Sequence, residues 1–185
     1  MSQGRDWVKS EVFYTVYQSP LGSIVLAATE AGLCWVEFSD GDTARLSLTR
    51  WAKKWMHTEN ITYTPEFFLE ATEQLDEYFG GERQEFTLPL DIHGTAFQKI
   101  VWEQLRQIPY GETRSYKDIA LAINAAKAVR AIGGANNKNP LSIFIPCHRV
   151  IGSNGALVGY GGGLNVKEYL LQLEGVLERS EVGSA

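Results

Sequence analysis

The sequence has few of the residues that build metal sites or disulfide scaffolds. Its 185 residues include only two cysteines, Cys34 and Cys147, and three histidines, His57, His93 and His148. The cysteines lack the Cys-x-x-Cys spacing of structural zinc sites, and two cysteines are too few for a disulfide framework. We therefore expect neither a metal site nor a cofactor.

Long apolar runs are also absent. No stretch of about 18 apolar residues is present, and the N-terminus has neither the apolar core nor the small-residue cleavage site of a signal peptide. Hydrophobic residues nevertheless make up 44% of the chain and aromatic residues 11%, which is enough for a packed core. These features predict a soluble cytoplasmic protein with no membrane partner.

The net charge of −5 is unevenly distributed along the chain. Residues 1–90 carry 7 basic and 14 acidic residues, whereas residues 91–185 carry 10 and 8. Between residues 111 and 149 only Glu112 and Asp118 oppose a series of basic residues. That series comprises Arg114, Lys117, Lys127, Arg130, Lys138 and Arg149. A basic surface on an acidic protein fits contacts with nucleic-acid phosphates, although many solvated faces have the same composition.

The first half of the chain predicts a small antiparallel sheet with helices, which we assign to an N-terminal domain of residues 1–90. Short segments rich in β-branched and aromatic residues, at 12–17, 24–28 and 34–38, are separated by Pro- and Gly-containing turns. One helix is expected after Asp42 and another from Pro65, which suits a first helical turn. Residues 86–92 are expected to form a strand or the connector to the second half.

The second half predicts a mostly helical domain, residues 91–185. Thr95 starts a helix with a capping box, and Ser115 caps a short helix. A further helix is expected after Asn124, continuing into Gly133-Gly134, and a last one at 166–174. Two short helices across a tight turn predict a DNA-binding helix-turn-helix. The predicted fold class is therefore α/β, with the sheet in the first half and the helices and active-site loop in the second.

The segment around Cys147 is the main candidate for chemistry. A thiol with the usual pKa of about 8.5 is mostly protonated at neutral pH, so a nucleophilic cysteine needs a base or a positive charge nearby. His148 and Arg149 follow directly and are candidates. Since neighbours in a strand point to opposite faces, this role requires a turn at Pro146-Cys147. From residue types alone, a buried structural cysteine is equally consistent. Cys34, in an expected strand, is predicted to be core packing.

Further motifs accompany this segment on both sides. They are Pro146-Cys147-His148-Arg149-Val150, Asn139-Pro140, Tyr160-Gly161-Gly162, Lys167-Glu168, Thr95-x-Phe97-Gln98, Ile108-Pro109-x-Gly111 and Ser115-Tyr116. Together they resemble the O6-alkylguanine-DNA alkyltransferase family over residues 94–175. The first 90 residues resemble the variable N-terminal domain of that family only loosely, in the order of strands and turns.

The resemblance implies a single-use DNA-repair enzyme. It would transfer the alkyl group of O6-alkylguanine, and less efficiently that of O4-alkylthymine, to Cys147. His148, acting through a water, and Glu174 would form the relay that activates the thiol, while Asn139 would brace the turn. Tyr116 would donate a hydrogen bond to guanine N3 and help to rotate the base.

The resemblance also implies a base pocket and a partner. Tyr160 and Gly161 would line the pocket near O6, and the carbonyls of Cys147 and Val150 would read the exocyclic amine. Double-stranded DNA would be bound through the minor groove, with Arg130 filling the stack that the flipped base leaves. The second helix is rich in small residues, which permits a close approach to the groove walls. Further DNA contacts are expected from Ser115, Ala128, Ala131 and Gly133. The free protein is expected to be a monomer, with cooperative packing on DNA left open.

Other functions fit parts of the same sequence. A cysteine hydrolase would use Cys147 and His148 over many turnovers. A transcriptional regulator would place the helix pair in the major groove of a defined site. A structural domain with a buried thiol would bind neither DNA nor alkyl groups. A non-catalytic protein that binds alkylated DNA is a further alternative, but such proteins replace the reactive cysteine that this chain retains.

Overall fold

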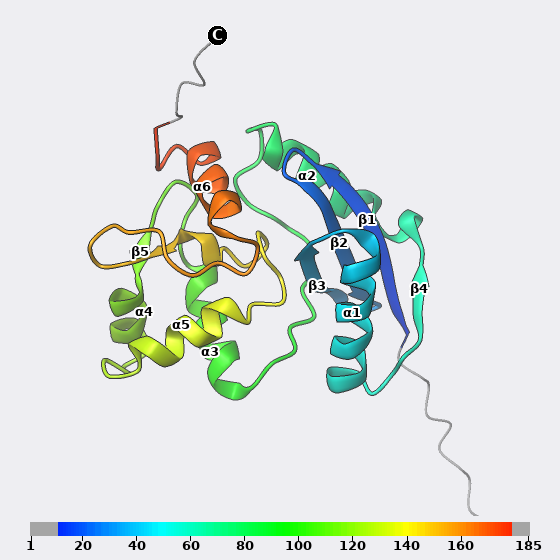
Figure 1. Cartoon of the computed structure of the whole chain (residues 1–185), viewed down its shortest axis with the longest axis horizontal. Coiled ribbons are helices and arrows are strands. Elements are labelled where there is room, and N and C mark those ends of the chain that lie inside the picture. Colours follow the sequence, from blue (N-terminus) through cyan, green and yellow to red (C-terminus); the bar gives the residue numbers. More distant parts are fainter. Residues whose placement is uncertain (1–10, 179–185) are drawn as a thin grey trace, which may run out of the picture.

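The computed structural model describes residues 11–178, in which a sheet-containing N-terminal half and a helical C-terminal half lie side by side (Figure 1). The predicted domains 1–90 and 91–185 therefore extend at their outer ends beyond the described residues. Within 11–178, no helix has the length and apolar character needed to cross a membrane. The same residues contain no cluster of three or more His, Cys, Asp or Glu side chains placed to hold a metal ion.

The N-terminal sheet has four strands in the order β3-β2-β1-β4. The three predicted strands are present as the antiparallel β1 (Val12–Ser19), β2 (Gly22–Thr29) and β3 (Gly32–Phe38). A short fourth strand, β4 (Ile61–Tyr63), pairs in parallel with β1, so the sheet is mixed. The parallel pairing arises because a helix connects β3 to β4 and carries the chain back across the sheet.

One face of this sheet is covered by helix α1 (Gly41–Trp55), shown in cyan in Figure 1. The helix starts at Asp40, whose carboxylate accepts a hydrogen bond from the Thr43 amide at 2.9 Å. Alternate residues of the strands pack against the apolar stripe of the helix. This small core contains Val12, Val25, Ala27, Cys34, Trp35, Ala44, Leu48 and Ala52. Cys34 is a free, fully buried cysteine, as predicted.

The second predicted helix begins at Pro65 with a 3-10 turn, Pro65–Phe68, and continues as α2 (Leu69–Phe79). Mostly apolar residues at three- and four-residue spacing predict that Phe68, Thr72, Leu75 and Phe79 form the buried face of this helix, but the observed face is rotated from it. Leu75 is buried as expected, but Thr72 and Phe79 are only partly buried, and Tyr78 is fully buried in their place. Tyr78 therefore points into the junction between the two halves. Residues 86–92 form a connector with a single isolated bridge between Leu90 and Leu33.

The C-terminal half consists of short helices joined by loops. They are α3 (Ala96–Arg106), α4 (Tyr116–Ala122), α5 (Val129–Asn137) and α6 (Leu164–Leu173). The capping boxes at Thr95 and Ser115 are both formed. A parallel pair of two-residue strands, β5 (Arg114–Ser115) and β6 (Val150–Ile151), joins the start of α4 to the segment that follows Cys147.

The predicted bounds of α5 were wrong. The helix starts at Val129 rather than after Asn124, and it runs through Gly133-Gly134 to Asn137. Asn124 has a positive φ of 56°, and the Ala128 amide closes a turn on the Ala125 carbonyl before the helix begins. The helix was predicted to continue only as far as Gly133-Gly134, since glycine is unfavourable inside helices. Here α3 supports the helix, since Trp102 Nε1 donates to the Ala135 carbonyl at 2.9 Å.

The two halves share one hydrophobic core, and the segment before Cys147 attaches to the edge of the sheet. The Val36 amide of β3 donates to the Pro140 carbonyl at 2.7 Å, and Val36 forms a parallel bridge with Leu141. The Leu33 amide binds the Pro89 carbonyl in the same manner. The edge strand β3 therefore positions both the connector and the residues that lead to Cys147.

Candidate active site

Cys147 is presented by a sharp turn of the backbone. Pro146 has φ −78° and ψ 62°, and the Cys147 amide donates to the Ile145 carbonyl at 2.7 Å, which is an inverse γ-turn. A short 3-10 helix, Cys147–Arg149, follows directly. The turn required at Pro146-Cys147 is thus present, so Cys147 and His148 are not constrained to opposite faces of a strand.

Asn139 holds both sides of the loop before this turn. Its Nδ2 donates to the Ile145 carbonyl at 2.8 Å, and its Oδ1 accepts from the Leu141 amide at 3.0 Å. Between them, Ile143 adopts a φ of 76°. A β-branched residue with a positive φ is strained by about 1 to 3 kcal/mol. The conformation persists because the surrounding contacts offset this strain. The geometry agrees with the bracing role expected of Asn139.

His148 and Glu174 form a buried pair next to Cys147. His148 Nε2 lies 2.8 Å from Glu174 Oε1, and both side chains are fully buried. Arg149 donates from Nε to Oε2 at 2.9 Å and from Nη2 to Oε1 at 3.0 Å. Burial alone would raise the pKa of Glu174, but the hydrogen bonds and charges of His148 and Arg149 outweigh it and lower the pKa to about 2. Glu174 is therefore ionised.

The ionised carboxylate determines the tautomer of His148. A carboxylate without a proton only accepts hydrogen bonds, so Nε2 carries the imidazole hydrogen and Nδ1 keeps a free lone pair. Nδ1 is buried and has no hydrogen-bond partner among residues 11–178. Burial also lowers the pKa of His148, against the opposing effect of Glu174, so the ring is neutral at neutral pH. The site thus contains a neutral base with its acceptor atom unused.

Lys167 is the cation next to Cys147, a role for which the sequence suggested Arg149. Burial raises the pKa of the Cys147 thiol, and a side-chain hydrogen bond with Asn139 and the charge of Lys167 act in the opposite direction. Lys167 is fully buried on α6, and its Nζ donates to the Val150 and Val158 carbonyls. Burial lowers the pKa of Lys167 to about 8, so the side chain remains charged at neutral pH. Arg149 instead neutralises Glu174.

Sequence reasoning missed Lys167 because lysines are almost never fully buried unless they are paired. The sequence did contain one signal: Lys167 lies between Val166 and Leu170 on the apolar face of α6. A lysine on such a face is buried and therefore needs a hydrogen-bond or charge partner. The Val150 carbonyl, predicted to read the guanine amine, accepts from this lysine in the structure. A carbonyl has two lone pairs, so one hydrogen bond leaves it able to accept another.

Of the two tyrosines with predicted roles, Tyr160 lies in the loop between β6 and α6, and Tyr116 contacts that loop from α4. Tyr160 is buried, its hydroxyl has no partner among the described residues, and its ring stands edge-on to His148 with a centroid distance of 6.5 Å. Tyr116, at the start of α4, donates to the Val158 carbonyl at 3.1 Å. Gly161 lies exposed in the same loop. Burial raises the pKa of both tyrosines, so both hydroxyls stay protonated and can donate.

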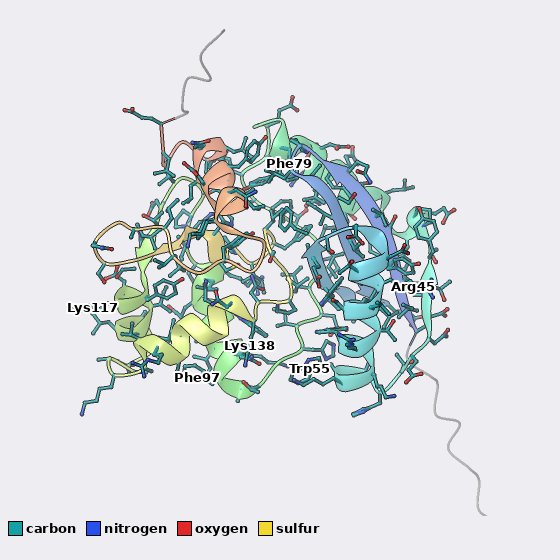
Figure 2. All side chains as sticks on the ribbon, in the orientation of Figure 1. Arg45, Trp55, Phe79, Phe97, Lys117 and Lys138 are labelled. Carbon is teal, nitrogen blue, oxygen red and sulfur yellow. The ribbon has the colours of Figure 1, made fainter. Side chains whose placement is uncertain are left out.

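The predicted DNA-contacting residues lie on and around α5. Arg130 is exposed in the first turn and forms no hydrogen bond or ion pair within residues 11–178. Ala131 is exposed beside it, and Ala128 is partly buried at the N-terminal end of the helix. Figure 2 shows Lys117 and Lys138 projecting from the same half of the molecule. Arg149 is buried, so the basic surface predicted from residues 111–149 is smaller than expected.

Gly133 and Ser115 have roles within the fold. A side chain at Gly133 would meet the Tyr116 ring at 3.9 Å, so this glycine faces α4. The Ser115 hydroxyl caps α4 and binds Asp118 at 2.7 Å. Gly134, in contrast, is exposed, and a Cβ there would meet no atom within 4 Å. Nothing inside the protein accounts for a glycine at position 134.

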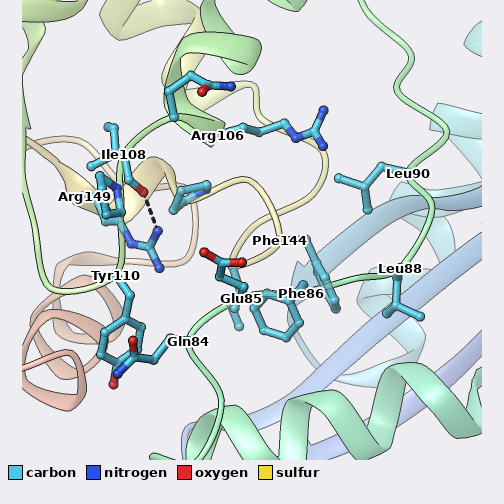
Figure 3. Close-up of a pocket in the computed structure, with 14 residues that line it drawn as sticks. Gln84, Glu85, Phe86, Leu88, Leu90, Arg106, Ile108, Tyr110, Phe144 and Arg149 are labelled. Atoms are coloured by element: carbon cyan, nitrogen blue, oxygen red, sulfur yellow. Dashed lines mark hydrogen bonds between the residues drawn. The ribbon is translucent and has the colours of Figure 1, made fainter.

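A pocket of about 390 Å³ lies between residues 84–90 and the C-terminal half, and Pro146 of the active-site turn is part of its wall (Figure 3). Phe86, Tyr110 and Phe144 line it together with Pro146 and Arg149. The dashed line in Figure 3 is the 2.6 Å hydrogen bond from Arg149 Nη1 to the carbonyl of Ile108. Arg149 therefore contacts both this pocket and Glu174.

Comparison with protein families matches both halves of the chain. Residues 12–92 match the family described as "6-O-methylguanine DNA methyltransferase, ribonuclease-like domain". Residues 96–176 match "6-O-methylguanine DNA methyltransferase, DNA binding domain".

Similar proteins match most of this chain. A methylated-DNA–protein-cysteine methyltransferase of Methanosarcina acetivorans is 48% identical over 164 residues, which are 89% of this chain and 99% of that protein. The constitutive enzyme of that name from Bacillus subtilis is 47% identical and covers 88% and 94% of the two chains. The crystal structure of Mycobacterium tuberculosis OGT in complex with DNA is similar, with a TM-score of 0.76 and 43% identity, over 88% of this chain and 92% of that one.

Proposed function

This chain belongs to the 6-O-methylguanine DNA methyltransferase family, and we propose from that premise how its residues carry out the reaction. The chain is a DNA-repair enzyme that acts by direct reversal: the methyl group of methylated DNA passes to a cysteine of the protein. Cys147 is the proposed acceptor, and the donor is O6-alkylguanine in double-stranded DNA. The observation that supports Cys147 over Cys34 is the neutral, oriented His148 beside it.

The reaction begins when the Cys147 proton passes to His148 Nδ1, the one ring nitrogen with a free lone pair, through an intervening water. The thiolate then attacks the alkyl carbon attached to O6, a carbon–sulfur bond forms, and the carbon–oxygen bond breaks with its electron pair moving to guanine. The guanine anion takes up one proton, which balances the proton that His148 accepted from Cys147, and becomes the repaired base. Lys167 stabilises the thiolate before attack, and Glu174 stabilises the imidazolium that forms.

The thioether product has no acyl bond that water can cleave. Each molecule therefore repairs one lesion and stops, which distinguishes this function from a cysteine hydrolase.

DNA approaches the surface around α5, and the lesion is flipped out of the duplex from the minor groove. Flipping costs a few kcal/mol, which Arg130 reduces by occupying the vacated position in the stack. Gly134 and Ala131 leave the exposed side of the helix without bulk, which suits a narrow groove. Tyr116 donates to guanine N3 after it leaves the Val158 carbonyl. Tyr160 and Gly161 line the pocket near O6.

Intact mass spectrometry tests this function. The protein is mixed with duplex DNA that contains one O6-methylguanine, and the mass is expected to rise by one methylene unit, about 14 Da, located at Cys147 by peptide mapping. The yield should plateau at one equivalent. The same duplex with unmodified guanine is the control.

The alternatives predict other results. A cysteine hydrolase would release product beyond one equivalent and return to its original mass, and a regulator or structural domain would show no mass change. A methyl group found on Cys34 would overturn the assignment of the acceptor while leaving the family function intact.

A further inference from the structure

Tyr78 lies outside the mechanism described above but contacts its buried carboxylate. It belongs to α2 of the N-terminal half and is fully buried. Its hydroxyl donates to Glu174 Oε1 at 2.7 Å, across a sequence separation of 96 residues. The N-terminal half therefore reaches the His148–Glu174 pair directly.

The carboxylate of Glu174 accepts several hydrogen bonds, and Tyr78 and His148 donate to the same oxygen. Oε1 accepts from Tyr78 at 2.7 Å, from His148 at 2.8 Å and from Arg149 at 3.0 Å. Oε2 accepts from Arg149 at 2.9 Å and, at a longer 3.4 Å, from the Gly111 amide. The other four donors all belong to the C-terminal half. The orientation of Oε1 toward His148 thus depends in part on the N-terminal half.

The hydroxyl of Tyr78 makes a contact of its own, separate from the packing of the ring. The Tyr78 ring packs against Phe86 and Tyr110 at centroid distances of 5.3 and 6.2 Å, contacts that a phenylalanine would also make. A buried hydroxyl without a partner would be unfavourable, and the 2.7 Å bond to the anionic Oε1 satisfies it with a charge-assisted hydrogen bond. Burial and the Glu174 charge raise the pKa of Tyr78 well above its usual range, so the hydroxyl remains a donor.

We propose that Tyr78 is a positioning residue for alkyl transfer, whose hydroxyl fixes the Glu174 carboxylate and limits the negative charge that Oε1 presents to His148. The proposal rests on the proposed function of Cys147 as the alkyl acceptor. By sharing Oε1, Tyr78 keeps His148 neutral and able to accept the proton of the thiol. The N-terminal half is thereby a part of the active site and not only a support for it.

The expected effect on pH dependence has a definite sign. Without the Tyr78 hydroxyl, Oε1 carries more negative charge, so both Glu174 and His148 retain protons to higher pH. Arg149 and Lys167 oppose this change, because their charges disfavour protonation of His148, and Tyr160 stands on the other side as a neutral group. His148 is then charged at pH values where the native ring is neutral. The acidic limb of the rate profile moves to higher pH.

The experiment compares Tyr78→Phe with Tyr17→Phe. Tyr17 is a matched control, because it is a buried tyrosine of the same half whose hydroxyl donates to the Asp76 carboxylate at 2.7 Å. Each variant loses one hydroxyl–carboxylate hydrogen bond, and thermal melts record the loss of stability. Transfer from free O6-benzylguanine is followed by intact mass across pH, so that DNA binding does not enter. Modification by methyl methanethiosulfonate, scored on the Cys147 peptide, reports thiolate reactivity independently of alkyl transfer.

We expect Tyr78→Phe to react several-fold more slowly on the acidic limb, which moves to higher pH, and at a near-native rate on the plateau. Tyr17→Phe should leave the limb in place. A Tyr78→Phe profile that overlays the native one, or an equal displacement by Tyr17→Phe, would overturn the proposal. If the native protein takes up no methyl group from duplex DNA that contains O6-methylguanine, the proposed function fails, and the thiosulfonate profiles of the two variants still decide whether Tyr78 controls the relay.

Discussion

The two halves of this protein differ in what they bury. In the N-terminal half the fully or nearly buried polar side chains are neutral, namely Thr15, Thr29, Thr58 and Gln74. In the C-terminal half they include the ionisable His148, Arg149, Lys167 and Glu174. Burying charge is costly unless each charge is paired, and in the C-terminal half Glu174 is paired with His148 and Arg149. The N-terminal half contributes packing, an edge strand and one hydroxyl to that arrangement.

The largest expected effect on alkyl transfer comes from replacing a cysteine by serine, once in each half of the protein. Cys147→Ser should reduce alkyl transfer by more than about a thousandfold, because a hydroxyl is a far poorer nucleophile, while DNA binding persists. Cys34→Ser should leave the rate constant unchanged and reduce the free energy of unfolding by about 1 to 3 kcal/mol, since a hydroxyl enters an apolar core. Single-turnover kinetics and chemical denaturation measure the two. Transfer at a near-native rate by Cys147→Ser would contradict the central assignment.

A second comparison concerns exposed arginines. Arg130→Ala should slow repair of duplex DNA by about ten- to a hundredfold, because the flipped base leaves a gap whose cost is a few kcal/mol. Reaction with free O6-benzylguanine, which needs no flipping, should be unaffected. Arg45→Ala, at an exposed site on α1, is the control and should change neither rate. Equal losses on both substrates would show that Arg130 acts through the pocket or through stability.

A third comparison concerns lysines. Lys167→Met should slow transfer roughly tenfold at neutral pH, because a charge-assisted interaction worth about 1.5 kcal/mol or more is removed from the thiolate. Burial lowers the pKa of Lys167 to about 8, so the native protein loses the Lys167 charge as pH rises through that value. The difference in transfer rate between the native protein and Lys167→Met should therefore become smaller above pH 8. Lys53→Met, at an exposed position of α1, is the control. A ratio that stays constant with pH would exclude the electrostatic role.

The smallest expected effect is on stability after reaction. An alkyl group on Cys147 must fit among Asn139, His148 and Tyr160, and overpacking of this kind costs about 1 to 3 kcal/mol. Methylated protein should therefore melt below unmodified protein, and benzylated protein lower still. Hydrogen exchange should increase around residues 139–150 and remain unchanged in β1 and β2. An unchanged melting temperature would refute the strain argument and leave the chemistry intact.

Much of the fold could be predicted from the sequence because its signals are local. The Thr95 and Ser115 capping boxes depend on residues three positions apart, and both are formed. The alternation and turns of the first three strands were sufficient to place them. The end of α5 could not be predicted, because Gly133 and Gly134 are unfavourable in a helix and only packing against α3 and α4 compensates for them.

The residues close to Cys147 in the sequence could be predicted, whereas some of those that only the fold brings near it could not. The turn at Pro146-Cys147 followed from chemistry, and Asn139 and Glu174 followed from the resemblance to a family. The geometry around all three agrees with the roles expected of them, which stay proposals. Tyr78 and Lys167 were missed because a tyrosine on an amphipathic helix and a lysine before a glutamate have ordinary structural explanations.

By itself the sequence determined the strand and helix types, the capping of the helices and the need for a turn at the reactive cysteine, because each depends on residues within a few positions of one another. Only the tertiary structure decided which charges are buried together. The partners of Glu174 come from α2 and from the 3-10 helix at Cys147, and Lys167 reaches the thiol from α6. The pKa values that prepare Cys147 arise from burial and from charges brought close by folding, and neither can be read from positions along the chain.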